Sequence, residues 1–157
     1  MKTPDSDLEG EGSDQGTRFD RMDRDECMDL VAEQMFGRVV MSVDCMPVAV
    51  PVMIKVIGGD IYFISDHGPK VDRAVRNTVV SIQVDHADLI DRTGWCVLVT
   101  GMSEIVTDND RIREVLRDLG AWTPSEHSVV VRVPSTVVRG RSLSRGRSDR
   151  FHPTDLP

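Results

Sequence analysis

The chain has 157 residues, enough for one compact domain with its own core but too few for two ordinary domains. Its formal net charge of −7 argues against general nucleic-acid binding, which needs clustered Lys and Arg facing the phosphates. No apolar stretch approaches the length of a membrane span, and the N-terminus lacks a hydrophobic signal region. We therefore expect a cytoplasmic protein with neither a membrane nor a nucleic-acid partner.

Both ends of the chain are poor in apolar residues. Residues 1–20 are rich in Asp, Glu, Gly and Ser, which predicts a disordered acidic tail. Residues 144–157 carry Arg, Ser, Gly and Pro, which predicts a flexible basic tail, and we favour a solvated terminus over a binding arm. One domain is thus predicted over residues 21–143.

The first predicted element is a helix. Asp23, with Glu26 three residues later, has the pattern of a capping box, and apolar residues follow at helical spacing. A helix is therefore predicted over residues 24–35, ended by Gly37.

Strands are predicted next, over residues 38–44, 48–57 and 61–65, which are rich in β-branched residues. The pair Gly58-Gly59 predicts a tight hairpin turn, because glycine readily adopts positive φ. Pro51 cannot donate a hydrogen bond to a sheet, which predicts a bulge or an unpaired edge at that point.

The second half of the chain also contains predicted strands and short helices. It predicts short helices over 71–76 and 108–119, the latter capped by Asp108, and strands over 79–85 and 94–106. Residues 128–133 and 136–140 are predicted to form a last strand or pair of strands, bent at Pro134. About six strands at hairpin spacing, without a βαβ rhythm, favour a mainly β protein: an antiparallel barrel with short connecting helices.

Residues 62–70 are the most informative local segment. They lead from a strand through a Gly-containing turn towards a helix that begins near Lys70. Backbone amides at a helix N-terminus, the Ser65 hydroxyl and the Lys70 ammonium would together hold a phosphate. An ordinary turn with a surface lysine explains the same residues, and local chemistry alone favours that interpretation. The spacings of triphosphatase loops and of dinucleotide folds are missing.

Other chemistry-bearing residues give weaker signals. Trp95 opens a strand, and its indole suits either core packing or contact with a planar ligand. The three cysteines, Cys27, Cys45 and Cys96, and the four histidines lack ligand spacing, so we predict no metal site and no disulfide framework. No nucleophile motif or assignable carboxylate pair occurs, and the catalytic residues stay unknown.

The order and spacing of several short motifs over residues 23–143 are more specific than any one of them. These motifs are Gly37-Arg38, Pro47-x-x-x-Pro51-Val52, Ile61-Tyr62-Phe63, Gly68-x-Lys70, Asp85, Gly94-Trp95-Cys96-Val97-x-Val99-x-Gly101 and Arg139-Gly140-Arg141. Together they resemble actinobacterial members of the pyridoxamine 5′-phosphate oxidase-like group of flavin and deazaflavin oxidoreductases. The resemblance implies a six-stranded split β-barrel of the FMN-binding type that forms a homodimer, with one flavin mononucleotide (FMN) at each end of the interface.

The resemblance also implies cofactor contacts, carried over position by position. They are Val50, Pro51, Val52 and Met53 along the isoalloxazine, Ile64, Ser65 and Lys70 at the ribityl phosphate, and Gln83, Trp95 and Arg141 near the flavin or the partner subunit. Two positions depart from the family pattern. Cys96 replaces a serine, and Pro69 replaces a Ser or Thr whose hydroxyl would contact the phosphate.

The implied function is an FMN-dependent oxidoreductase that acts on an unknown small-molecule substrate. Such chemistry is carried by the cofactor, which is consistent with the missing catalytic motif. Oxidation of pyridoxamine phosphate itself is disfavoured, because the sequence shows no arginine-rich site for a second phosphate. Two alternatives stay open. One is a deazaflavin-dependent reductase, with Arg73, Arg76 and the C-terminal arginines near the cofactor's polyglutamate tail; the other is a non-catalytic flavin- or haem-binding protein.

Overall fold

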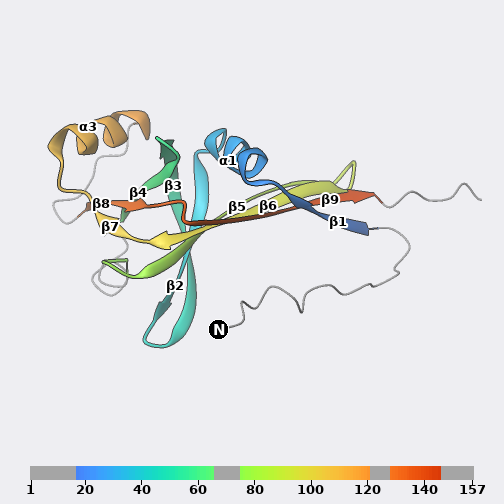
Figure 1. Ribbon diagram of the computed structural model, residues 1–157, viewed down its shortest axis with the longest axis horizontal. Helices are drawn as coiled ribbons and strands as arrows, with labels where there is room; N and C mark the ends of the chain where they lie inside the picture. Colours follow the sequence, from blue (N-terminus) through green and yellow to red (C-terminus); the bar gives the residue numbers. More distant parts are fainter. Residues whose placement is uncertain (1–16, 66–74, 121–127, 146–157) are drawn as a thin grey trace, which may run out of the picture.

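A computed structural model describes residues 17–65, 75–120 and 128–145. In these residues, nine strands form one sheet in the order β1-β9-β6-β5-β2-β3-β4-β8-β7, and all neighbouring strands are antiparallel (Figure 1). The elements are β1 (Thr17–Met22), α1 (Arg24–Ala32), β2 (Phe36–Val43), β3 (Met46–Ile57), β4 (Asp60–Ser65), β5 (Val79–Asp88), β6 (Thr93–Met102), β7 (Glu104–Ile105), α3 (Asn109–Asp118), β8 (Val129–Val133) and β9 (Val137–Arg145). The mainly β, antiparallel prediction is confirmed.

The sheet has nine strands instead of the expected six. The segments predicted over 128–133 and 136–140 form two separate strands, β8 and β9, and two further differences add β1 and β7. Strand β1 begins at Thr17, inside the segment expected to be a disordered tail, because it pairs with β9 along its whole length. The predicted strand over 94–106 is divided at Ser103, whose N–H and hydroxyl both donate to the Thr78 carbonyl. Strand β9 also extends to Arg145, beyond the expected end of the domain.

The structure confirms the predicted helix cap at Asp23 and the predicted turn at Gly58 and Gly59. Asp23 caps α1 by accepting a hydrogen bond from the Glu26 N–H at 2.8 Å. The turn between β3 and β4 is formed by Gly58 and Gly59, with φ of +61° and +84°. Pro51 lies opposite Arg38 of β2, and no described strand pairs with it on the other side of β3. This agrees with the unpaired edge predicted at Pro51. Most of the helix predicted over 71–76 lies outside the described residues.

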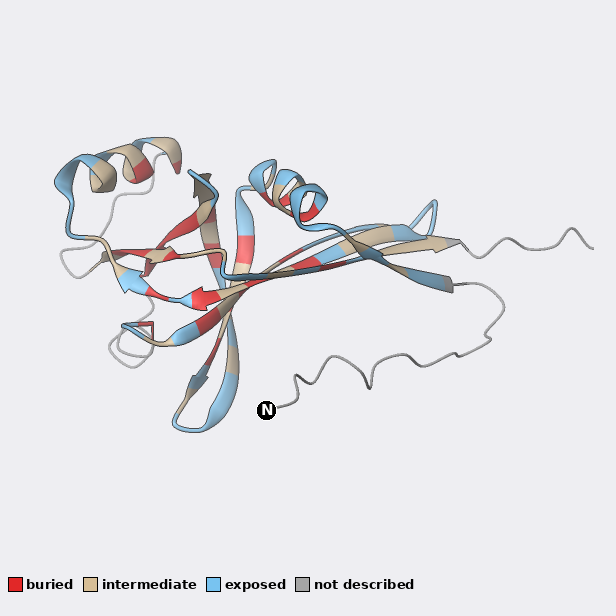
Figure 2. Ribbon diagram, viewed as in Figure 1, coloured by how far each residue is buried: buried red, intermediate tan, exposed pale blue. Residues whose placement is uncertain are grey.

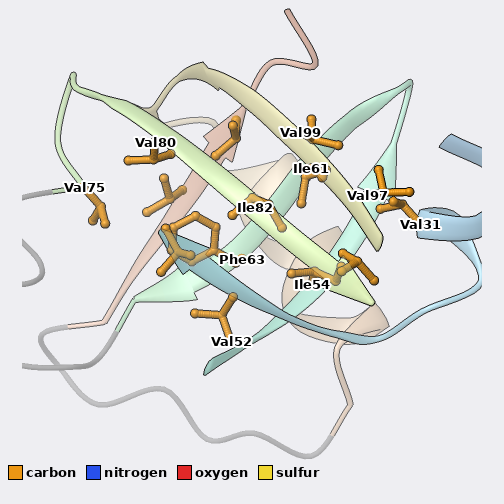
Figure 3. Packing of buried hydrophobic residues seen from close by; sticks show 14 of the residues in the cluster. Val31, Val52, Ile54, Ile61, Phe63, Val75, Val80, Ile82, Val97 and Val99 are labelled. Atoms are coloured by element: carbon orange, nitrogen blue, oxygen red, sulfur yellow. The ribbon is translucent and has the colours of Figure 1, made fainter. Parts of the chain in front are cut away.

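Strand alternation divides the sheet into a core side and an outer side. Figure 3 shows core-side residues of β3, β4, β5 and β6 converging on one cluster around Phe63, which has no exposed surface. The other fully buried members labelled there include Val31, Ile54, Ile61, Ile82, Val97 and Val99. Burial of these branched side chains is the main favourable contribution to folding.

The two described helices cover different parts of this sheet. Helix α1 is buried along one side (Figure 2), and its buried residues Cys27 and Val31 pack against the core side. Val115 of α3 and Leu119, the C-cap of that helix, are buried over the outward side chains of β4 and β8. The outer side of β2, β5, β6 and β9 is covered by neither described helix. Neither of them is long and apolar enough to cross a bilayer.

Gly140 permits the close contact between α1 and β9. A Cβ atom at this position would overlap the Sγ atom of the fully buried Cys27. We predict that Gly140→Ala lowers the free energy of unfolding by about 1–3 kcal/mol, the usual cost of overpacking a core. Urea denaturation measures this change.

The matched test is a double-mutant cycle with Cys27→Ala, which removes the overlapping sulfur. In that background Gly140→Ala should cost much less. An equal cost in both backgrounds would show that Cys27 is not the limiting contact.

Candidate functional site

The side of the sheet that neither described helix covers carries a row of aligned side chains. Pro51 lies opposite Arg38, Arg38 opposite Gln83, Gln83 opposite Leu98, and Leu98 opposite Arg139. Residues directly opposite one another in antiparallel strands project to the same side. These five residues therefore form one row across β3, β2, β5, β6 and β9.

A second row lies two residues further along the same strands. Asp85 lies opposite Cys96, Cys96 opposite Arg141, and Arg141 opposite Arg21 of β1. A shift of two residues keeps a side chain on the same face of a strand. We call the two rows together the outer face.

A polar network connects the centre of the outer face. Arg38 Nη1 donates to Asp85 Oδ1 at 2.6 Å, with both side chains about two-fifths exposed. Gln83 Nε2 lies 3.5 Å from the same oxygen and 3.8 Å from Cys96 Sγ. The ion pair holds the carboxylate in place, so the Gln83 amide and the Cys96 thiol sit beside a fixed negative charge.

This environment determines the protonation of Cys96. Burial raises the pKa of its thiol, and the negative charge of Asp85 raises that pKa further. The thiol is therefore protonated at neutral pH. Since the thiolate is the reactive form, Cys96 is suited to packing and weak hydrogen bonding rather than to nucleophilic attack.

A groove of about 470 Å³ lies at the end of the outer face formed by β1, β9 and β6. Its described lining combines three arginines with mainly apolar neighbours and contains no acidic side chain. Its lining residues are Arg21, Met22, Cys96, Leu98, Val137, Val138, Arg139, Gly140 and Arg141. Such a surface suits a ligand with an anionic group and an apolar body.

Three of the predicted cofactor contacts lie on the outer face. Pro51 and Gln83 belong to its first row, and Arg141 belongs to the second row and to the groove. The structure thus brings together predicted residues from three strands that are far apart in the sequence.

Other predicted contacts of β3 and β6 lie elsewhere. Val50 and Val52 alternate with Pro51 and pack on the core side, while Met53 packs with the cluster under α3. Trp95 also packs against the core, with its ring centroid 6.3 Å from that of His86. For Trp95, this position supports the core-packing interpretation.

The predicted phosphate contacts lie at the end of β4. Ser65 is fully buried, and Ile64 lines an apolar cavity of about 250 Å³ beneath α3. Lys70 and Pro69 lie outside the described residues, so the predicted phosphate site around Lys70 stays a prediction. Among the described residues, no three His, Cys, Asp or Glu side chains are placed to hold a metal ion.

Sequence reasoning did not assign several outer-face residues to a site. Arg38, Asp85 and Arg139 occurred only within the family motifs, and Arg21 had no assigned role at the start of the predicted domain. The spacing of Arg139 and Arg141 does place both on one side of a strand. Arg21 could not be added without knowing that β1 pairs with β9.

Comparison with known proteins decides the family. A family model described as pyridoxamine 5′-phosphate oxidase matches residues 23–142. The chain belongs to this family. A relative in Mycobacterium tuberculosis, the uncharacterised protein Rv0080, is 34% identical over 124 residues, which cover 76% of this chain and 82% of the relative.

Solved structures of similar proteins confirm the split barrel expected for a pyridoxamine 5′-phosphate oxidase family member. An FAD-binding protein from Mycobacterium smegmatis is 26% identical with a TM-score of 0.63, covering 80% of this chain and 98% of its own. An FAD-binding protein from Mesorhizobium loti is 25% identical with a TM-score of 0.68, covering 82% and 99%. The likeness therefore extends over nearly the whole of both relatives.

The network around Cys96 predicts a pH effect. Replacing Asp85 with Asn removes a negative charge that disfavours the thiolate, so the pKa of Cys96 should fall and its alkylation profile should move to lower pH. Iodoacetamide labelling at several pH values, followed by peptide mass spectrometry, measures this shift.

The exposed Cys45 provides an internal control in the same samples. Its profile should be the same in the wild type and in Asp85→Asn. If the Cys96 profile also stays unchanged, Asp85 does not act on this thiol.

Proposed function

We propose that this protein is a cytoplasmic, flavin-dependent oxidoreductase that binds its flavin on the outer face and acts on a small molecule as a homodimer. The observation that carries the proposal is the outer face, which neither described helix covers and where Pro51, Gln83 and Arg141 come together in one chain of this family. The two FAD-binding relatives, each at least 25% identical over about four-fifths of this chain, support a flavin.

The residues of the outer face fit the chemical parts of a flavin. Pro51 and Leu98 offer apolar contact for a flat ring system, and the Gln83 amide can both donate and accept hydrogen bonds. Arg38 and Arg141 add positive charge, which favours an electron-rich ring and a phosphate. When bound, a flavin supplies the transfer of hydride or electrons, so the chain needs no nucleophile. A protonated, unreactive Cys96 is compatible with chemistry that the flavin supplies.

The exposure of this face supports the proposed homodimer. A flavin lying on one side of a sheet keeps its other side in water unless something covers it, and a second copy of the chain would exclude that water. Sedimentation of the flavin-loaded protein should give twice the chain mass of 17.5 kDa. A monomeric flavin-loaded protein would contradict this part of the proposal.

The flavin itself is testable by absorbance. We expect the purified protein to be yellow, or to take up FMN with saturation in a titration, because FMN is the cofactor that the family resemblance implies. Parallel titrations with FAD and with deazaflavin distinguish the alternatives, since the two solved relatives are FAD-binding proteins. A colourless protein that takes up none of the three would refute the flavin proposal.

Turnover is tested separately with the flavin-loaded protein and a reduced nicotinamide. Oxidation of the nicotinamide above the rate of free flavin supports the oxidoreductase. Tight flavin binding without turnover with any reductant would favour the non-catalytic alternative, and a haem absorption band on purification would favour its haem version.

Lys70 is predicted to contact the flavin phosphate. We expect Lys70→Ala to weaken FMN binding by about 1.5–3 kcal/mol, the range for a hydrogen bond to a charged group. Lys55→Ala is the matched control, since Lys55 lies on β3 with its ammonium 3.7 Å from Asp118 of α3. Equal affinities of Lys70→Ala and wild type in fluorescence titration would exclude Lys70 from the site.

A further inference from the structure

Helix α3 keeps part of its apolar surface only half-buried. Val115 and the C-cap residue Leu119 are buried over β4 and β8, whereas Ile112 and Leu116 are only partly buried against the same cluster. Residues four apart in a helix are neighbours on one face, so Ile112 and Leu116 lie together. The helix therefore presents two branched side chains that its contact with the sheet does not cover fully.

A cavity of about 250 Å³ lies at these two side chains, and we call it the α3 cavity. Apart from Ser128, every described residue that lines it is Ile, Leu or Val. Three further members of its wall, Ile105, Val106 and Val129, are also only half-buried. The lining of an empty apolar cavity lacks contacts that an occupant would supply. An apolar cavity of about 150 Å³ already admits benzene, so a compact ring or branched alkyl group fits the α3 cavity.

A second cavity, of about 490 Å³, adjoins the first, and we call it the polar cavity. Ile105 and Val106 line both, so the two cavities meet at this segment. A molecule with its apolar part in the α3 cavity can therefore extend past the segment into the polar cavity. The charged residues in the described lining of the polar cavity are Asp60, Glu104, Asp108, Arg111 and Arg132.

Each of these charged side chains already has a partner within the chain. The contacts are Arg132 with Asp60 at 2.8 Å and with Glu104 at 2.7 Å, Arg111 with Glu114 at 2.6 Å, and Asp108 with the Asp110 N–H at 2.9 Å. A ligand end with a charge of its own would lose hydration without gaining an unpaired opposite charge. A hydroxyl or amide can instead add hydrogen bonds to groups that stay paired.

We propose that the α3 cavity and the polar cavity form one binding site for an uncharged small molecule. A compact ring or branched alkyl group lies in the α3 cavity, and a hydroxyl or amide end lies in the polar cavity. The site goes beyond the proposed flavin function, because the described lining of the two cavities shares no residue with the two rows of the outer face.

Titration calorimetry of the full-length protein with phenethyl alcohol tests the site, since this probe joins one ring to one hydroxyl. The wild type should bind it saturably. Ile112→Trp fills the α3 cavity with an indole and should weaken binding by about tenfold or more, because the probe's ring loses its place. Arg113→Trp is the matched control: it adds the same side chain to α3 at a position that is 73% exposed, and its affinity should equal that of the wild type.

Thermal unfolding without ligand separates cavity filling from damage to the fold. Ile112→Trp should melt at the wild-type temperature or higher, because a side chain that fills an apolar cavity is stabilising. Leu116→Phe makes a smaller change at the same cavity and should also weaken phenethyl alcohol binding. If Ile112→Trp melts far below the wild type, Leu116→Phe decides the question, and an unchanged affinity in that variant overturns the proposal.

Charged analogues of the probe test the polar end. Phenethylamine and phenylacetate carry the same ring with a positive and a negative end. Both should bind at least about tenfold more weakly than phenethyl alcohol, because their charges would be desolvated without an opposite charge to pair with. Equal or tighter binding of either analogue would overturn the uncharged class of ligand.

Two further outcomes concern what fills the α3 cavity. Residues 121–127, which contain Trp122, join α3 to β8 and lie outside the described residues. Binding of phenethyl alcohol by Trp122→Ala but not by the wild type would show that the chain itself fills the cavity, and would overturn the proposal. Absence of binding by both proteins would also overturn it. Binding by a wild-type protein that takes up no flavin would refute the flavin function while leaving this site standing.

Discussion

The antiparallel register between β5 and β6 is the constraint on which the rest of the molecule depends. It runs without a break from Val79 opposite Met102 to Asp88 opposite Thr93. A slip of one residue would turn the fully or almost fully buried Ile82, Val84, Val97 and Val99 outward and force Gln83 and Asp85 into the core. Burying an unpaired carboxylate is far more costly than exposing an apolar side chain, so the register is strongly determined.

The same register creates the candidate site. Because the core needs every second residue of β5 and β6, the intervening residues are left to form one continuous outer face. Strands β2 and β9 extend that face on either side, which adds Arg38 to one flank and Arg139 and Arg141 to the other. A rigid, hydrogen-bonded sheet therefore positions groups that a loop would hold less accurately. The same strand pairings therefore stabilise the fold and position the residues that we propose to bind the ligand.

Helix α3 shows why the two ends of the outer side differ. Over β4 and β8, Val115 and the C-cap residue Leu119 cover Tyr62 and Ile64, so this end forms a second hydrophobic cluster. No described helix covers the β2, β5, β6 and β9 end, where polar and charged side chains alternate with the core residues. This is the end on which we propose that the flavin binds.

Sequence reasoning succeeded where the signal was local. The Asp23 cap, the Gly58-Gly59 turn and the alternation of buried and exposed residues depend on neighbours within a few positions, and they predicted most elements and the fold class. It failed for β1, whose ordering depends on pairing with β9 more than a hundred residues away.

The candidate site was predictable only in part, for the same reason. The family motifs led to Pro51, Gln83 and Arg141, but a cluster that draws on six strands becomes visible only when the register is known. Successive side chains of β3 point to opposite sides of the sheet, so Val50 and Val52 face the core while Pro51 faces outward. A motif of consecutive residues does not show this difference.

Amide chemical-shift mapping during an FMN titration tests the central claim, that the outer face is the ligand-binding surface, most directly. We expect the largest shifts at Gln83, Cys96 and Arg141, in adjacent strands of that face. Shifts confined to Val115, Leu119 and the cavity beneath α3, with the outer-face amides unmoved, would contradict it.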